Sequence, residues 1–139
     1  MAGKLGLNGF GRIGRYLLRL AAEHNFDIDI VAINGSARTD HAHMAHLLKY
    51  DSVHRIFPGE VAATEKGIVV NGKEIKVTKA APGEWDWAGL GVDAVLDNTG
   101  KFTKREDAGK HLARGAKKVI ISAPAKEPDG TFVMGVNDK

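Results

Sequence analysis

The sequence predicts an α/β fold, a doubly wound and mostly parallel sheet with an inserted antiparallel hairpin region. Three observations favour it: short apolar segments alternate with amphipathic ones, a glycine-rich turn joins the first pair, and a stretch rich in valine and isoleucine interrupts the alternation. The chain has 139 residues, 43% hydrophobic and 27% charged, which is enough for one globular domain with its own core and too few for two.

A βαβ unit is predicted at the start of the chain. Lys4 to Asn8 reads as a short strand, and from Arg12 to about His24 apolar residues recur at the three- and four-residue spacing of a helix with one buried face. Ile28 to Ile33 is short and mostly branched, which fits a second strand buried in a parallel sheet. We expect the connection between the two strands to be right-handed.

The later elements continue the alternation around one insertion. A helix is predicted from His41 to Tyr50. Three antiparallel strands, with Asn71-Gly72 as a hairpin turn signal, are expected next at Glu60 to Ala63, Gly67 to Val70 and Glu74 to Val77. A strand, a helix and two further strands are predicted at Ala94 to Asp97, Lys104 to Arg114, Val119 to Ser122 and Phe132 to Met134. Together these elements predict a Rossmann-type sheet.

The turn Gly9-Phe10-Gly11-Arg12-Ile13-Gly14 has the spacing of a dinucleotide phosphate site. It follows a predicted strand and opens a helix, so its glycines can serve a tight turn, room for a pyrophosphate and close packing of helix on strand. A helix start offers free N–H groups and a partial positive charge, which both stabilise a phosphate. Arg12 and Arg15 oppose the helix dipole, which favours a bound anion over a purely structural turn.

The end of the second predicted strand bears on which dinucleotide binds. An NAD-specific site usually carries an acidic residue here, but the sequence reads Asn34-Gly35-Ser36-Ala37-Arg38. No carboxylate repels a 2′-phosphate, and Ser36 with Arg38 could bind one. We therefore expect NAD or NADP as cofactor, with NADP preferred as a hypothesis. The alternative is that Asp40 or backbone groups serve NAD while Arg38 faces solvent.

Composition excludes several classes of site. The chain contains no cysteine, so it can form no disulfide, thiolate metal site or cysteine nucleophile of its own. No signal segment or membrane-length apolar run is visible, which predicts a soluble, cytoplasmic protein with no membrane partner. The formal charge of +3 is too mild to demand nucleic acid, and the basic patches Lys101 to Arg105 and Lys117-Lys118 are expected to be solvated surface.

Histidines and tryptophans are the remaining candidate ligands. Of His41, His43 and His46, only the last two share a helical face, and no carboxylate or thiolate partner is evident by spacing, so no metal site is predicted. Trp85 and Trp87 are expected to cover the sheet edge rather than to stack on bases.

The opening segment Gly6 to Arg15 resembles that of the phosphorylating glyceraldehyde-3-phosphate dehydrogenases. Further segments similar to this family follow in the right order at His46 to Ser52, Asn98 to Thr103, Gly115 to Pro124 and Val133 to Asn137. The resemblance identifies residues 1–139 as an NAD(P)-binding domain. Together with the motif, it predicts cofactor contacts at Asn8, Gly9, Phe10, Gly11, Arg12, Ile13, Gly14, Asn34, Gly35, Ser36, Arg38, Thr99, Gly100, Phe102, Ser122 and Ala123.

Each part of this set has an implied role. The resemblance places Arg12 and Ile13 at the pyrophosphate, Asn34 to Ser36 at the adenosine ribose, Thr99, Gly100 and Phe102 at the adenine side, and Ser122 and Ala123 at the approach to the nicotinamide. The sequence departs from the family at Gly35, where aspartate is general, at Arg55, where glycine is usual, and in a shorter stretch from Lys79 to Trp87.

In this family a cysteine attacks the aldehyde, a histidine takes the thiol proton, hydride passes to the cofactor and phosphate releases the acyl group. The resemblance implies that the cysteine follows shortly after Asn137, and that the histidine and phosphate-binding residues belong to a second domain. The sequence ends at Lys139 without them. We therefore expect cofactor binding without turnover, no catalytic residue, and a missing catalytic domain.

The parent protein is expected to be an NAD(P)-dependent aldehyde oxidoreductase of glycolysis or gluconeogenesis. Two alternatives remain open at this stage: the cofactor domain of an erythrose-4-phosphate dehydrogenase, and a non-catalytic nucleotide- or RNA-binding module. Without the partner domain, an apolar face and a sheet edge would be uncovered, which predicts self-association or a homo-oligomer.

Overall fold

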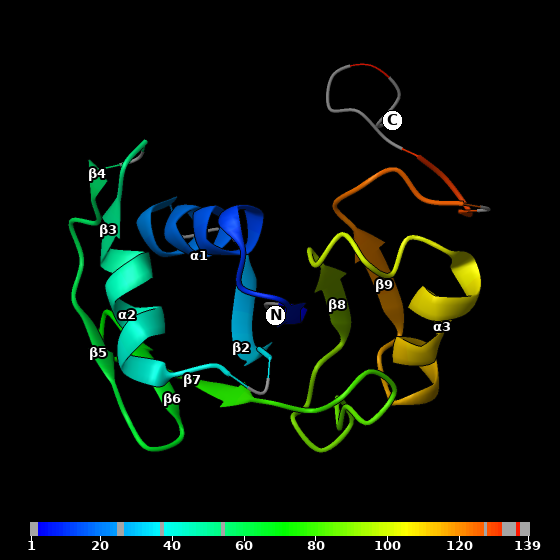
Figure 1. The fold of residues 1–139 in the computed structure, drawn as a ribbon, viewed down its shortest axis with the longest axis horizontal. Coiled ribbons are helices and arrows are strands. Elements are labelled where there is room, and N and C mark those ends of the chain that lie inside the picture. Colours follow the sequence, from blue (N-terminus) through cyan, green and yellow to red (C-terminus); the bar gives the residue numbers. More distant parts are fainter. Residues whose placement is uncertain are drawn as a thin grey trace.

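The computed structural model describes residues 3–24, 27–36, 38–53, 55–126, 128–131 and 136. Figure 1 shows α2 with the short strands β5 and β6 on one side of the molecule and α3 beside β9 on the other. In chain order the elements are β1 (Gly3–Asn8), α1 (Arg12–His24), β2 (Ile28–Asn34), α2 (His41–Lys49), β3 (Tyr50–Asp51), β4 (Arg55–Ile56), β5 (Val61–Ala63), β6 (Gly67–Val70), β7 (Lys73–Thr78), β8 (Ala94–Asp97), α3 (Arg105–Ala113) and β9 (Lys118–Ile121).

The main sheet is doubly wound, as predicted. In the described residues its seven strands lie in the order β5-β6-β7-β2-β1-β8-β9, and all neighbours from β7 to β9 pair in parallel. The chain adds β2 and β7 on one side of β1 and then β8 and β9 on the other. This reversal opens a crevice at the carboxyl ends of the strands, which is where ligands bind in such sheets.

The inserted region is smaller than the sequence indicates. β5 and β6 are antiparallel, and Asn71 and Gly72 turn the chain between β6 and β7 with φ of 51° and 81°. β7 pairs antiparallel with β6 but parallel with β2, so its prediction as an inserted strand is wrong. The turn signal determines only how β6 meets β7, whereas the second neighbour of β7 is set by tertiary packing.

The ends of the other predicted elements agree with the structure to within one residue. The helix predicted to reach Tyr50 stops at Lys49, because Tyr50 is extended, with φ of −116° and ψ of 120°, and begins the small antiparallel pair of β3 and β4. The strand predicted at Phe132 to Met134 lies outside the described residues. No helix in the described ranges combines the length and the apolar character needed to cross a membrane.

Within the part of the chain that the structure describes, two hydrophobic clusters form the core. One joins the sheet to α1 and α2 and includes Leu7, Leu18, Ile33 and Leu48. The other comprises the buried residues Ala32, Trp85, Trp87, Val92, Val95 and Ala116. Because successive side chains of a strand point to opposite faces, β8 contributes Val95 to the second cluster and Leu96 to the first.

Both tryptophans belong to the second cluster, so the prediction that they cover the sheet edge is wrong. Trp85 is 2% exposed and Trp87 is fully buried. A Cβ on Gly6, in the central strand β1, would lie 2.8 Å from a ring atom of Trp87. The glycine therefore lets the indole pack onto a face of the sheet, where a large aromatic ring buries more apolar surface than it would at an edge.

A buried arginine connects α1 to the end of α2. Arg19 Nε donates to the carbonyl of Leu48, Nη2 donates to those of Lys49 and Arg55, and the guanidinium lies 5.7 Å from the Phe57 ring centroid. Helix carbonyls at a C-terminus lack intrahelical partners, and a cation there also complements the helix dipole. Arg19 thus fixes α2, which forms one wall of the cleft described below.

Candidate functional site

A cleft with a volume of about 620 Å³ opens at the carboxyl ends of β1, β2, β7 and β8. This is the edge at which the reversal of strand order predicts a ligand site. The cleft brings together many of the residues predicted from the sequence: Asn8, Gly9, Phe10, Asn34, Gly35, Ser36, Arg38, Thr99 and Phe102.

Other predicted residues lie outside the cavity lining. Gly11, Arg12 and Ile13 are exposed at the start of α1, and Gly14 is buried in its first turn. Gly100 is exposed in the loop after β8. Ser122 and Ala123 follow β9, and the Ser122 N–H donates to the Asp97 carbonyl at 3.1 Å. The cofactor contacts assigned to the predicted residues, inside and outside this lining, stay predictions.

The three glycines of the turn differ in what surrounds them. Gly9 has φ of 98°, and a Cβ there would lie 2.9 Å from the Thr99 side chain. A Cβ on Gly14 would lie 3.0 Å from both polar atoms of the Asn98 amide, whose Nδ2 donates to the Gly9 carbonyl. A Cβ on Gly11 would meet nothing closer than 4.0 Å. Protein packing thus requires the outer glycines, whereas the middle one leaves open space.

The open space at Gly11 faces the start of α1. The Arg15 N–H donates to the Gly11 carbonyl at 3.0 Å and closes the first turn, so the N–H groups of the preceding helical residues have no acceptor within the helix. The first turn contains no acidic residue. Arg15 itself donates from Nη1 to the Phe10 carbonyl at 2.9 Å, so it braces the turn. Of the two arginines taken to favour an anion, Arg12 is the exposed one.

The end of β2 is shaped by Thr39. The Gly35 N–H donates to the Thr78 carbonyl at 2.8 Å, and a Cβ on Gly35 would collide with the Thr39 side chain. Asp40 caps α2, because its carboxylate accepts from the His43 N–H. Ser36 Oγ accepts from the Arg38 N–H at 3.3 Å. Thr39 therefore occupies the space that an acidic side chain at position 35 would need.

The structure adds cleft residues that sequence reasoning missed. Lys79 and Lys101 line the cavity together with Arg38, and Trp85, Met44 and Leu47 supply apolar wall. Lys79 directly follows β7, which ends beside β2. The sequence holds no local signal for Lys79. Its place follows from the parallel pairing of β7 with β2, because the carboxyl ends of parallel strands share one edge of the sheet.

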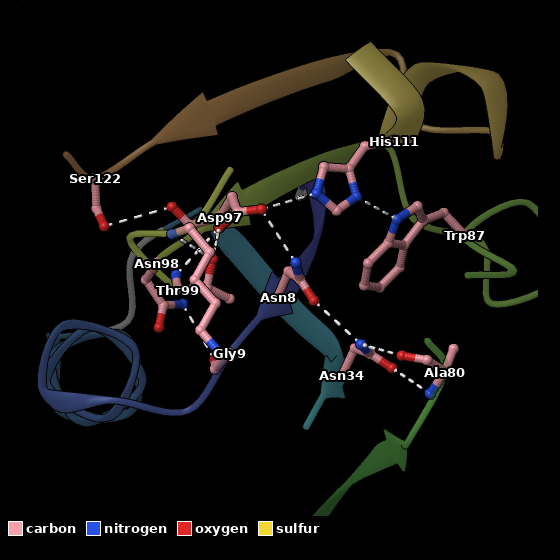
Figure 2. Close-up of polar contacts among 11 residues, drawn as sticks. Asn8, Gly9, Asn34, Ala80, Trp87, Asp97, Asn98, Thr99, His111 and Ser122 are labelled. Carbon is pink, nitrogen blue, oxygen red and sulfur yellow. Dashed lines mark hydrogen bonds and ion pairs between the residues drawn. The ribbon is translucent and has the colours of Figure 1, made fainter. Parts of the chain in front are cut away.

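A polar network runs beneath the cleft (Figure 2). Asn34 Nδ2 donates to Asn8 Oδ1 at 3.1 Å, and Asn8 Nδ2 donates to Asp97 Oδ2 at 3.0 Å. Burial raises the pKa of Asp97, but hydrogen bonds from His111, Thr99 and Asn8 outweigh that effect and hold this pKa below its ordinary value. Asp97 is therefore a carboxylate that orders its neighbours.

The histidines of α2 do not form a metal site. In the described ranges, no group of three or more histidine or acidic side chains is placed to hold a metal ion. His41 Nδ1 is 2.8 Å from the Thr64 carbonyl, whereas His43 and His46 are exposed. His43 lines the cleft.

Comparison with known proteins agrees with this geometry. The model of the glyceraldehyde 3-phosphate dehydrogenase NAD-binding domain family matches residues 3–105, which is most of the chain. The chain belongs to this family. The matched segment contains all the predicted cofactor contacts except Ser122 and Ala123.

Relatives extend the likeness over the whole sequence. The chain is 58% identical to the glyceraldehyde-3-phosphate dehydrogenase of Geobacillus stearothermophilus over 99% of its own length, 55% identical to glyceraldehyde-3-phosphate dehydrogenase 1 of Bacillus cereus over 96%, and 53% identical to the Thermotoga maritima enzyme over 97%. It spans about 40% of the length of each of these proteins. These matches do not favour the erythrose-4-phosphate or RNA-binding alternatives.

Proposed function

We propose that these residues form the dinucleotide-binding part of a cytoplasmic glyceraldehyde-3-phosphate dehydrogenase that oxidises and phosphorylates its aldehyde in glycolysis or gluconeogenesis. The observation that carries the proposal is the open space at Gly11, next to Phe10 of the cleft lining and to the first N–H groups of α1, which have no acceptor within the helix. A pyrophosphate fits such a place, since helix N–H groups and the helix dipole stabilise an anion that a side chain at Gly11 would displace.

The predicted contacts assign each part of the cofactor to an element. The turn and first helical residues, Gly9 to Gly14, would hold the pyrophosphate, with Asn8 beneath it. Asn34 to Ser36 would hold the adenosine ribose, and Thr99, Gly100 and Phe102 the adenine side. Ser122 and Ala123, which directly follow β9, would lie where the cofactor approaches its nicotinamide position. The bound dinucleotide supplies hydride acceptance, while these residues bind and orient it.

We further propose that NADP is accepted and preferred. Gly35 carries no acidic side chain at the end of β2, and Ser36, Arg38 and Lys79 lie on the same cleft. A guanidinium and an ammonium together can neutralise a 2′-phosphate. Asp40 is the acidic group of this wall, and it already accepts from the His43 N–H. Lys79 adds a second cation to the phosphate site that Arg38 alone would form.

Calorimetric titration of the 139-residue chain with NAD and NADP tests both proposals. We expect both to bind, with NADP tighter, and the Lys79→Ala and Arg38→Ala variants to lose affinity for NADP more than for NAD. Lys118→Ala, an exposed lysine on β9, is the matched control and should change neither. Binding of NAD at least tenfold tighter than NADP would end the NADP preference, and binding of neither would end the proposed function.

We propose that the chain alone binds cofactor without turnover, and that a catalytic domain and further copies of the chain are its partners. The sequence contains no cysteine for attack on an aldehyde. Mixing the chain with NAD or NADP, glyceraldehyde 3-phosphate and phosphate should give no reduced cofactor at 340 nm, whereas titration detects binding. Reduced cofactor formed by the pure chain would contradict this part of the proposal.

A further inference from the structure

His111 of α3 is a fully buried histidine at the end of the polar network. Its Nε2 lies 3.0 Å from Oδ2 of Asp97, and its Nδ1 lies 2.9 Å from Nε1 of Trp87. Figure 2 shows the imidazole between the indole on one side and the carboxylate on the other. Trp85 stacks on the same imidazole, with ring centroids 3.8 Å apart. No sequence motif singled out this histidine.

The partners of His111 determine where its proton is. An indole N–H can only donate, and a carboxylate can only accept. Nδ1 therefore accepts from Trp87, and Nε2 carries the proton that is donated to Asp97. The ring is neutral and has one tautomer, since a proton on Nδ1 would face the Trp87 donor. In the described part of the chain, Asp97 is the charged group that contacts the ring, and Trp85, Trp87 and Phe102 are its aromatic neighbours.

Asp97 links the hydrogen bonds of His111 to residues of the cleft. Besides His111, its Oδ2 accepts from Asn8 Nδ2 at 3.0 Å, and its Oδ1 accepts from the Thr99 N–H at 3.1 Å and the Thr99 hydroxyl at 2.7 Å. Four donors fill the acceptor capacity of a carboxylate. Asn8 and Thr99 both line the cleft, whereas His111 and Trp87 do not. Loss of the His111 donor would free the carboxylate to rotate and release both cleft residues.

We propose that His111 and Trp87 are positioning residues of the dinucleotide site, because their single-tautomer hydrogen-bond chain fixes Asp97 and thereby the orientations of Asn8 and Thr99. The inference rests on the proposed function of the cleft. It assigns a role in cofactor binding to two side chains that lie outside the cavity and act through hydrogen bonds rather than through contact with the ligand.

Imidazole ¹⁵N NMR of the 139-residue chain at pH 7 tests the hydrogen-bond chain without any ligand. We expect His111 to carry its proton on Nε2 and to show Nδ1 as an acceptor. In the Trp87→Phe variant, which loses the indole donor but keeps an aromatic ring, Nε2 should keep its proton because Asp97 still accepts it, while the Nδ1 signal should change to that of a nitrogen that accepts no hydrogen bond. A wild-type His111 that carries its proton on Nδ1, or that is doubly protonated at pH 7, would overturn the proposal.

Titration with the tighter-binding dinucleotide tests the effect on the cleft. His111→Leu removes both hydrogen bonds and is expected to weaken binding roughly tenfold, the loss typical of a hydrogen bond to a charged group. His111→Gln can still donate to Asp97 and should stay within about threefold of the wild type. Ile68→Ala, a buried change in the other hydrophobic cluster, should lower Tm without changing affinity.

The outcomes separate the two proposals. If the wild type binds and His111→Leu binds equally tightly, the positioning role fails while the proposed function stands. If the wild type binds neither dinucleotide, the proposed function fails and the positioning role falls with it. Should His111→Leu not fold, Trp87→Phe takes its place, with binding roughly threefold weaker expected because one hydrogen bond of the chain is lost. Unchanged affinity in Trp87→Phe would then overturn the proposal.

Discussion

Arg19 Nε, on α1, donates to the Leu48 carbonyl near the end of α2 at 2.9 Å, and Arg19 is only 4% exposed. The same guanidinium also serves the carbonyls of Lys49 and Arg55. A single side chain thus joins α1 to a segment about thirty residues further along the chain, and its loss would leave three buried or partly buried carbonyls without this donor.

Replacement of Arg19 is therefore expected to destabilise the fold. Arg19→Met keeps much of the side-chain volume but removes every donor, and we expect the free energy of unfolding to fall by about 2–4 kcal/mol, since buried carbonyls are left unpaired. Urea denaturation measures this loss. Lys76→Met, an exposed change on β7, should cost less than about 0.5 kcal/mol. Equal stability of the two variants would show that the Arg19 hydrogen bonds contribute little.

The glycine turn allows a matched pair of variants. Gly11→Ala adds a methyl group into open space, so Tm should be unchanged or slightly raised, while dinucleotide binding should weaken by more than about tenfold because the methyl occupies the proposed pyrophosphate position. Gly14→Ala pushes against the Asn98 amide and should lower Tm as well as affinity. Tight binding by folded Gly11→Ala would place the phosphates elsewhere.

Position 35 is coupled to Thr39. Gly35→Asp alone should lower Tm, because the new side chain collides with Thr39, and it should weaken NADP binding through charge repulsion. Adding Thr39→Ala makes room for the carboxylate, so the double variant should recover stability and favour NAD over NADP. Titration of the two variants with both cofactors, beside their melting curves, checks this. Independent, additive effects of the two changes would contradict the coupling.

Acid stability should depend on Asp97. Its pKa in the folded protein lies below the ordinary value of 3.8, so the unfolded state binds more protons between these two pKa values. The stabilisation from this group is therefore complete above pH of about 4–5 and is lost as the pH falls through the folded pKa. Urea denaturation of Asp97→Asn should show lower stability at pH 7 and a shallower decline toward acid. An unchanged slope would mean that other carboxylates dominate.

β9 is one of the two edge strands of the main sheet in the described residues, and two apolar side chains near it are exposed: Ile120 at 53%, on β9, and Leu112 at 50%, on α3. We expect the isolated chain to self-associate as its concentration rises, since an unpaired edge with apolar side chains favours strand addition. Ile120→Lys should shift it toward monomer in light scattering. A wild-type chain that is monomeric at millimolar concentration would contradict this expectation.

Local patterns predicted much of this molecule, and long-range contacts supplied the rest. Apolar residues at helical spacing located the helices, and short runs of branched residues located the strands. The spacing of Gly9 to Gly14 located the turn. All of these patterns depend on residues close together in sequence. Lys79 and Thr39 escaped prediction because their proximity to Gly35 depends on which strand neighbours β2 and on the path of the loop before α2. The bonds from His111 to Asp97 and Trp87 join residues 14 and 24 positions apart, a spacing that no motif records.

The chain has only two tryptophans, and both lie against one imidazole: Trp85 by stacking on it and Trp87 by donating to it. Trp85 is also part of the cleft wall. All indole fluorescence of this protein consequently arises from one spot, where quenching by the histidine and by anything that enters the cleft acts on the same pair of emitters. The two indoles therefore report together on the candidate cleft, and no other tryptophan in the sequence adds to their emission.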